Sequence, residues 1–214
     1  MHTASGIRQG PLSVDLIRTL PLLAGWFFLA VWLGLSGRLA AAGAPPIALG
    51  VTIVAPLVLF ALDSRVGNPI FGGFLRLELP ALIALQTFRI IGIVFVVAWL
   101  GGTLPAGFAL PAGLGDVAVG LSAPFVAAAV AQRRRHHAVL ARVWSIAAVA
   151  DLVIAVTSGV LHSSTPLGIL RGPVTTDIMA FYPLSLIPTF LVPLALLLHI
   201  CAFRALSAKS SRPD

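Results

Sequence analysis

Charged residues are scarce in this sequence. Only 10% of the 214 residues are charged, whereas 58% are hydrophobic. An ordinary soluble domain has about a quarter of its residues charged. Mean hydropathy is +1.02, and several apolar runs continue for close to 20 residues without a charge. A soluble fold with so much apolar sequence would need more polar surface than the chain supplies, so we expect a membrane protein.

Cysteine is nearly absent as well, since Cys201 is the single one. This excludes an internal disulfide and a metal cluster built on cysteine. The sequence also lacks the HExxH zinc motif, the phosphate-binding GxxxxGK[ST] loop and the Gly-x-Ser-x-Gly nucleophile elbow. We therefore predict no metal site and no cofactor.

The apolar runs are typical of membrane-spanning helices. They do not alternate with a period of two, and a helix satisfies its own backbone hydrogen bonds in lipid. A helix of about 20 residues crosses the hydrocarbon core of about 30 Å. We predict an all-α bundle of six transmembrane helices that forms one domain over residues 1–214. The predicted spans are residues 16–36, 46–62, 80–100, 115–131, 139–162 and 177–203.

The first apolar run has a second interpretation. Residues 20–35 are followed by small residues at 39–44, a pattern that also fits a signal peptide cleaved after Ala42. The run is long, contains tryptophan and is followed at once by another apolar run. These features favour a retained first span.

The net charge of +7 does not indicate a nucleic-acid-binding protein, because the basic residues lie in short connectors and near the two ends. Six spans with both termini in the cytoplasm place Arg65, Arg76 and Arg133–Arg135 inside, and only Arg38 and Arg171 outside. The run from Gln86 to Asp116 resembles small multi-pass bacterial proteins. The resemblance implies the cytoplasmic (inner) membrane of a bacterium.

Arg89 and Asp151 are the strongest candidates for a functional pair. Each lies 11 residues before the outer end of its predicted span, and so about 16 Å below the outer surface. A lone charge at this depth is costly, and opposite charges at equal depth on different helices can pair. Two interpretations stay open: an ion pair that only holds two helices in register, or a working site.

A second set of polar residues surrounds this pair. Gln86 lies one turn from Arg89, while Asp116 and Asp177 precede the fourth and sixth predicted spans. The two aspartates either cap helix N-termini or form a polar outer mouth with His162 and Tyr182.

Three functions agree with these observations. The first is a module that binds or translocates a small solute or a proton, with Arg89, Asp151, Gln86, Asp116, His162, Asp177 and Tyr182 as the candidate residues. The second is a membrane-embedded enzyme for a lipid or isoprenoid substrate, in which Asp116, Asp151 and His162 supply acid–base chemistry. The third is a non-catalytic accessory subunit of a larger membrane complex. The expected partners are the lipid bilayer and a solute, proton or lipid, and the sequence leaves a homo-oligomer open.

Overall fold

All regular secondary structure in the part of the chain that the structure describes is helical. This computed structural model covers residues 11–41, 43–65 and 71–210, and no strand occurs within these ranges. Four helical segments are long and apolar enough to cross a membrane: Leu79–Leu100, Ala106–Ala131, His137–Leu161 and Ile187–Ala208. Two shorter apolar helices cover Thr19–Leu35 and Ile47–Asp63. The all-α prediction is confirmed, and four of the predicted spans have the length and composition of membrane helices.

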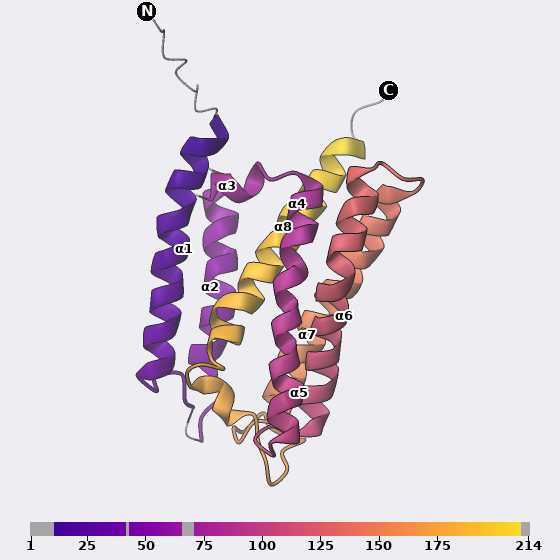
Figure 1. Cartoon of the computed structure of the whole chain (residues 1–214). Coiled ribbons are helices and arrows are strands. Elements are labelled where there is room, and N and C mark those ends of the chain that lie inside the picture. The colour runs from indigo at the N-terminus through magenta and orange to yellow at the C-terminus, as the bar shows by residue number, and fades with distance from the viewer. Residues whose placement is uncertain (1–10, 42, 66–70, 211–214) are drawn as a thin grey trace, which may run out of the picture.

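Helices α1 (Pro11–Leu35) and α2 (Ile47–Asp63) stand at one side of the bundle (Figure 1). The helix α8 (Val192–Ser210) passes obliquely between them and the remaining helices. The indole N–H of Trp26 on α1 donates a hydrogen bond of 3.0 Å to the carbonyl of Thr189. This bond ties α1 to the segment that leads into α8. The cleavage position after Ala42 lies outside the described residues.

The predicted third span is one continuous helix with a tighter middle. After the short α3 (Gly72–Leu75), it consists of α4 (Leu79–Leu85), the 3₁₀ segment η1 (Gln86–Gly92) and α5 (Ile93–Leu100). A 3₁₀ stretch inside a long helix often marks strain or a functional position.

Helix α6 begins earlier than the sequence suggests. It covers Ala106–Ala131, so of the segment 101–113 between the third and fourth predicted spans only residues 101–105 form the connection. Gly101 and Gly102 form the turn after α5, whereas Gly107 and Gly113 lie inside α6. A Cβ at Gly107 would collide with the imidazole of His162, and one at Gly113 would crowd Val96. Close helix packing offsets the low helix propensity of glycine here.

The last span begins later than predicted. Residues 177–203 do not form one helix: η2 (Asp177–Ala180) is a short 3₁₀ turn, and the membrane-length helix starts with the π-helical segment η3 (Ile187–Leu191) before α8. Proline explains the delay. Pro183 lacks the backbone N–H and disfavours helical geometry at the residue before it, whereas Pro188 lies at the start of η3, where a helix tolerates proline.

The described chain starts and ends at the same end of the bundle, where α1 begins and α8 finishes (Figure 1). We name this the proximal end; it also holds the connection from α6 to α7 (His137–Leu161). The opposite, distal end holds the connections from α1 to α2, from α5 to α6 and from α7 to η3. Helix α6 packs against four other helical segments: α4, η1, α5 and α7.

Candidate functional site

The site is built on the 3₁₀ segment η1. Its buried residues are Gln86, Arg89 and Gly92, which are spaced by three. A 3₁₀ helix has three residues per turn, so these positions lie directly above one another on one face. That face meets α6, which is the main neighbour of η1. The local backbone therefore aims Gln86 and Arg89 into the bundle.

Arg89 is 2% exposed and donates hydrogen bonds to three acceptors on two helices, α6 and α7. Its Nε donates to Oδ1 of Asp116 on α6 at 2.6 Å, and its Nη2 donates to Oδ2 of Asp151 on α7. Its Nη1 donates to the backbone carbonyl of Ala148 at 3.0 Å. We name Arg89, Asp116 and Asp151 the charge cluster. One buried guanidinium thus joins two carboxylates from two neighbouring helices.

The charge cluster lies near the middle of the helices. Arg89 comes 11 residues before Leu100, Asp116 ten residues after Ala106, and Asp151 ten residues before Leu161. At about 1.5 Å per residue, all three lie roughly 15 to 16 Å from the distal helix ends. Arg89 and Asp151 form the ion pair that their equal depth allows.

Asp116 does not have the position that the sequence indicates. Because α6 begins at Ala106, Asp116 lies inside this helix and neither caps its N-terminus nor forms part of a distal mouth. It is buried, with 7% of its surface exposed, and pairs with Arg89. The expected position at the start of the fourth span is wrong, because the Gly- and Pro-rich segment before it is helical.

Two glycines make room for the charge cluster. A Cβ at Gly92 on η1 would overlap the side chain of Asp116, and a Cβ at Gly115 on α6 would overlap the carboxylate of Asp151. Glycine at these positions lets the helices approach closely enough for direct ion pairs. Their spacing alone does not distinguish them from the other glycines of the chain.

Three buried polar side chains lie on the proximal side of the cluster. Gln86 Nε2 donates to the carbonyl of Ala195 at 3.0 Å, and the ring of His199 lies 5.7 Å from the ring of Trp144. Gln86 Oε1, His199 Nε2 and the hydroxyl of Ser145 are buried and have no hydrogen-bond partner among the described residues. Buried polar atoms are normally paired, so these atoms extend an unusual polar zone from the charge cluster toward the proximal end. Sequence analysis identified Gln86 but neither Ser145 nor His199.

The distal candidates do not join the cluster. His162 ends α7, with Nδ1 2.9 Å from the carbonyl of Ser158, and its ring lies against Gly107. Tyr182 is 48% exposed. The structure brings together Arg89, Asp116, Asp151 and, one turn away, Gln86. It leaves His162, Asp177 and Tyr182 at the distal end.

Asp177 anchors the long connection between α7 and η3. Its Oδ1 accepts a hydrogen bond of 2.9 Å from the backbone N–H of Ser164. Burial raises the pKa of Asp177, but hydrogen bonds to Ser164 and Thr175 lower it more, so the pKa of this carboxyl lies below its ordinary value. Asp177 is therefore ionised at neutral pH.

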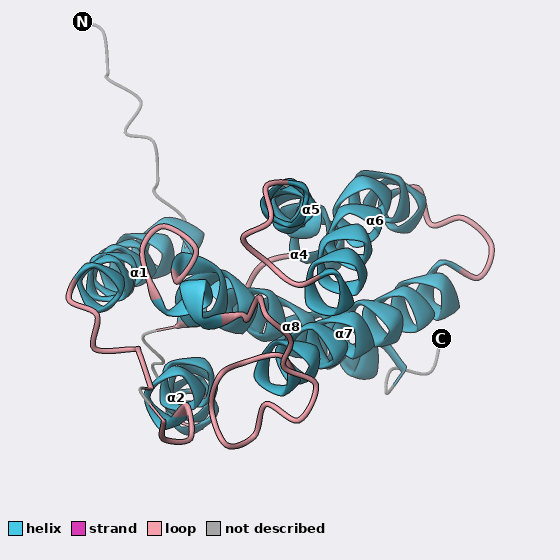
Figure 2. Ribbon diagram, turned by 90° about the horizontal axis from the view of Figure 1, so that it is seen from below, coloured by secondary structure: helices cyan, strands magenta, loops and turns pink. Residues whose placement is uncertain are grey.

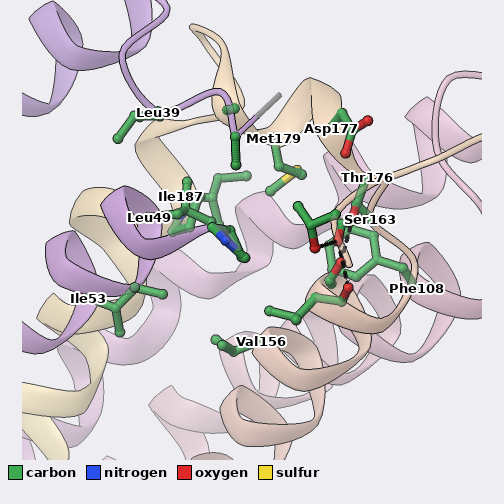
Figure 3. Close-up of a pocket in the computed structure, with 18 of the residues that line it drawn as sticks. Leu39, Leu49, Ile53, Phe108, Val156, Ser163, Thr176, Asp177, Met179 and Ile187 are labelled. Carbon is green, nitrogen blue, oxygen red and sulfur yellow. Dashed lines mark hydrogen bonds between the residues drawn. The ribbon is translucent and has the colours of Figure 1, made fainter. Parts of the chain in front are cut away.

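A cavity of about 560 Å³ opens at the distal half of the bundle (Figure 3). Its walls come from α2, α7, η3 and the start of α8, and its rim comes from residues 39–41, 45–47, 163–167 and 176–181. Figure 3 shows Leu49, Ile53 and Ile187 on one side and Phe108, Ser163 and Thr176 on the other. Most of the lining is apolar, but Asp116 also lines the cavity. The charge cluster is thus next to a space large enough for a small molecule.

The described residues contain no group of three His, Cys, Asp or Glu side chains placed to hold a metal ion. Residues 74–207 match a family described as a domain of unknown function (DUF8737). The match runs from α3 through most of α8, includes the whole charge cluster and leaves out α1 and α2. No curated protein and no solved structure matches the chain.

Proposed function

We propose that this chain, which belongs to the family of the domain of unknown function DUF8737, is a membrane module that binds and translocates a proton or another small solute at its charge cluster. One observation carries the proposal: a single buried guanidinium at mid-depth is held by two carboxylates, one of which lines a cavity. An intramembrane ionisable cluster of this kind is costly to keep and is typical of ion and proton pathways.

The charge balance of the cluster points to the proton. One guanidinium and two ionised carboxylates carry a net charge of −1, which is costly in a low-dielectric interior. Uptake of one proton, or of one small monovalent cation, makes the cluster neutral. Gln86 and His199 continue the polar zone on the proximal side.

The proposed topology has six spans with both termini on the cytoplasmic side of a bacterial inner membrane. Arg65, Arg76, Arg133–Arg135 and Arg204 lie at the proximal end, whereas Arg38 and Arg171 lie at the distal end, as the positive-inside rule expects for a cytoplasmic proximal end. The hydrogen bond from Trp26 favours a retained first helix. A membrane-impermeant thiol reagent added outside cells should label Leu167→Cys and not Gln132→Cys.

Proton flux tests the function directly. The full chain is reconstituted into phosphatidylcholine vesicles that enclose a pH-sensitive dye, and a potassium gradient with valinomycin drives the flux. We expect a flux above that of protein-free vesicles, and we expect Asp116→Asn and Asp151→Asn to abolish the increase. Glu78→Gln is the matched control, because it makes the same carboxyl-to-amide change at an exposed position.

Two results would contradict proton translocation. One is a wild-type flux equal to that of empty vesicles, and the other is an Asp151→Asn flux equal to the wild-type flux. Infrared difference spectroscopy adds a second readout, because a proton bound at the cluster gives a protonated carboxyl band that Asp116→Asn or Asp151→Asn removes.

A membrane-embedded enzyme for a lipid or isoprenoid substrate is the second candidate, since an apolar cavity reaches the carboxylate of Asp116. Among the described residues, Asp151 and His162 do not line this cavity. Of the three groups expected to supply acid–base chemistry, only Asp116 is therefore in reach of a bound substrate. A non-catalytic accessory subunit predicts a tightly packed bundle, and the cavity weighs against it.

A further inference from the structure

We infer that the cavity between α2 and α7 is a binding site for an uncharged lipid with one long apolar chain and a hydroxyl head group, the class of long-chain and isoprenoid alcohols. The inference concerns the cavity alone. It holds whether the charge cluster carries protons or acts on the bound lipid.

The walls of the cavity select an apolar chain. Leu49 and Ile53 from α2 line the space together with Val156 from α7, and Ile187 from η3 lies beside Leu49 (Figure 3). The volume of about 560 Å³ lies within the range of ligand sites, roughly 300 to 1,000 Å³. Cavities with apolar walls exclude water and accept apolar molecules instead. In a bilayer, lipid chains are the apolar molecules at hand.

The depth of the cavity matches one leaflet. Along α7 the lining runs from Leu152 to Val160, which corresponds to about 12 Å, and Ser163 extends it beyond the end of the helix. Half of the hydrocarbon core measures about 15 Å. A lipid chain inserted from the distal side would therefore end beside Asp116 and Leu152, at the level of the charge cluster.

The rim of the cavity selects the head group. Among the described residues, no Lys, Arg or His lines the cavity, whereas the ionised carboxylate of Asp177 does. An anionic head group would meet this negative charge without a compensating cation. Thr176 Oγ1 donates its proton to the carbonyl of Gly159 at 2.6 Å, and Ser163 Oγ donates to Val160 at 2.7 Å. Ser163 Oγ also lies 2.7 Å from Thr165 Oγ1, whose proton it accepts. The Thr176 hydroxyl is therefore the acceptor that the rim offers, and it favours a ligand that donates a hydrogen bond.

The arrangement of the helices gives the ligand a lateral route. Seen from the distal end, α2 and α7 stand on opposite sides of α8 (Figure 2). Helix α2 packs against η3 and α8, and α7 packs against α6 and α8. Gly50 of α2 also lines the cavity, and a Cβ there would find nothing within 4 Å. A chain can enter between these two helices from the surrounding lipid.

Photolabelling tests the inference. The full chain in phosphatidylcholine vesicles is irradiated with a trace of a photoreactive C15 isoprenoid alcohol, and the labelled peptides are mapped by mass spectrometry. We expect labelling of Leu49–Ile53 and Leu152–Val160, and competition by the unlabelled alcohol. The acid with the same chain should compete about tenfold less well, because Asp177 repels its carboxylate.

Matched variants give the test its specificity. Val156→Trp fills the cavity from α7 and should reduce labelling about tenfold, whereas Val153→Trp on the same helix is 57% exposed and should leave it unchanged. Gly50→Trp fills the cavity from α2 and serves as the second variant if Val156→Trp does not fold. Wild-type labelling of both filled variants would overturn the inference, as would equal competition by the acid or labelling that the alcohol does not compete. Proton flux and labelling are measured separately, so either proposal can fail alone.

Discussion

Replacement of Arg89 by methionine would leave Asp116 and Asp151 buried without a cation. Methionine keeps much of the length of the side chain, so the main change is the loss of the guanidinium. Removing one partner of a buried ion pair costs about 3–5 kcal/mol, because an uncompensated charge stays behind. The carbonyl of Ala148 also loses its donor. We expect Arg89→Met to lower the free energy of unfolding by about 3–5 kcal/mol.

Replacement of either aspartate should lower the free energy of unfolding by less than Arg89→Met does. Asp116→Asn and Asp151→Asn each leave Arg89 with one carboxylate, so each weakens one charge-assisted hydrogen bond, worth about 1.5–3 kcal/mol. Each also removes the net charge of −1, which offsets part of this loss. The triple variant Arg89→Met, Asp116→Val, Asp151→Val contains no buried charge at the cluster. Apolar replacement of a whole buried ion cluster is often neutral, so we expect its stability to return to within about 2 kcal/mol of the wild type.

Unfolding in dodecyl maltoside micelles with increasing dodecyl sulfate, followed by tryptophan fluorescence and far-ultraviolet circular dichroism, measures these differences. Arg142→Met is the control, because it removes an exposed arginine from α7 and should change stability by less than about 1 kcal/mol. The reasoning fails if Arg89→Met behaves like Arg142→Met. It also fails if the triple variant is as unstable as Arg89→Met.

Three further predictions use the same unfolding measurement. Gly115→Ala should lower the free energy of unfolding by about 1–3 kcal/mol, because its Cβ overlaps the Asp151 carboxylate. Gly25→Ala on α1 has open space around the new Cβ and should raise the free energy of unfolding by up to about 1 kcal/mol, so equal effects of the two variants would contradict this packing. Ser145→Ala removes a buried hydroxyl without a partner and should be neutral or stabilising by about 1 kcal/mol, so a clear loss of stability would mean that the hydroxyl is bonded. Asp177 contributes stability above its unfolded pKa of about 3.9, and that contribution is lost as the pH falls through its lower folded pKa. Asp177→Asn should therefore weaken the protein at neutral pH and remove this acid-dependent step, and an unchanged acid profile would disprove the role of the Ser164 contact.

The sequence by itself determined the class of the protein and part of the site. Apolar runs of membrane length predict helices because the bilayer thickness and the helical rise are constants. The same constants place Arg89 and Asp151 at equal depth without knowledge of the fold, and the structure joins them. These conclusions depend only on distances along single helices.

The tertiary structure decided what depends on contacts between helices. Asp116 is in the charge cluster because α6 starts at Ala106, and the glycines before it are helical because neighbouring helices lie too close for a Cβ. The 3₁₀ segment that aligns Gln86 with Arg89, and the cavity between α2 and α7, likewise depend on which faces meet. Glycine and proline are locally ambiguous between turn and helix, and only packing against a partner selects one conformation.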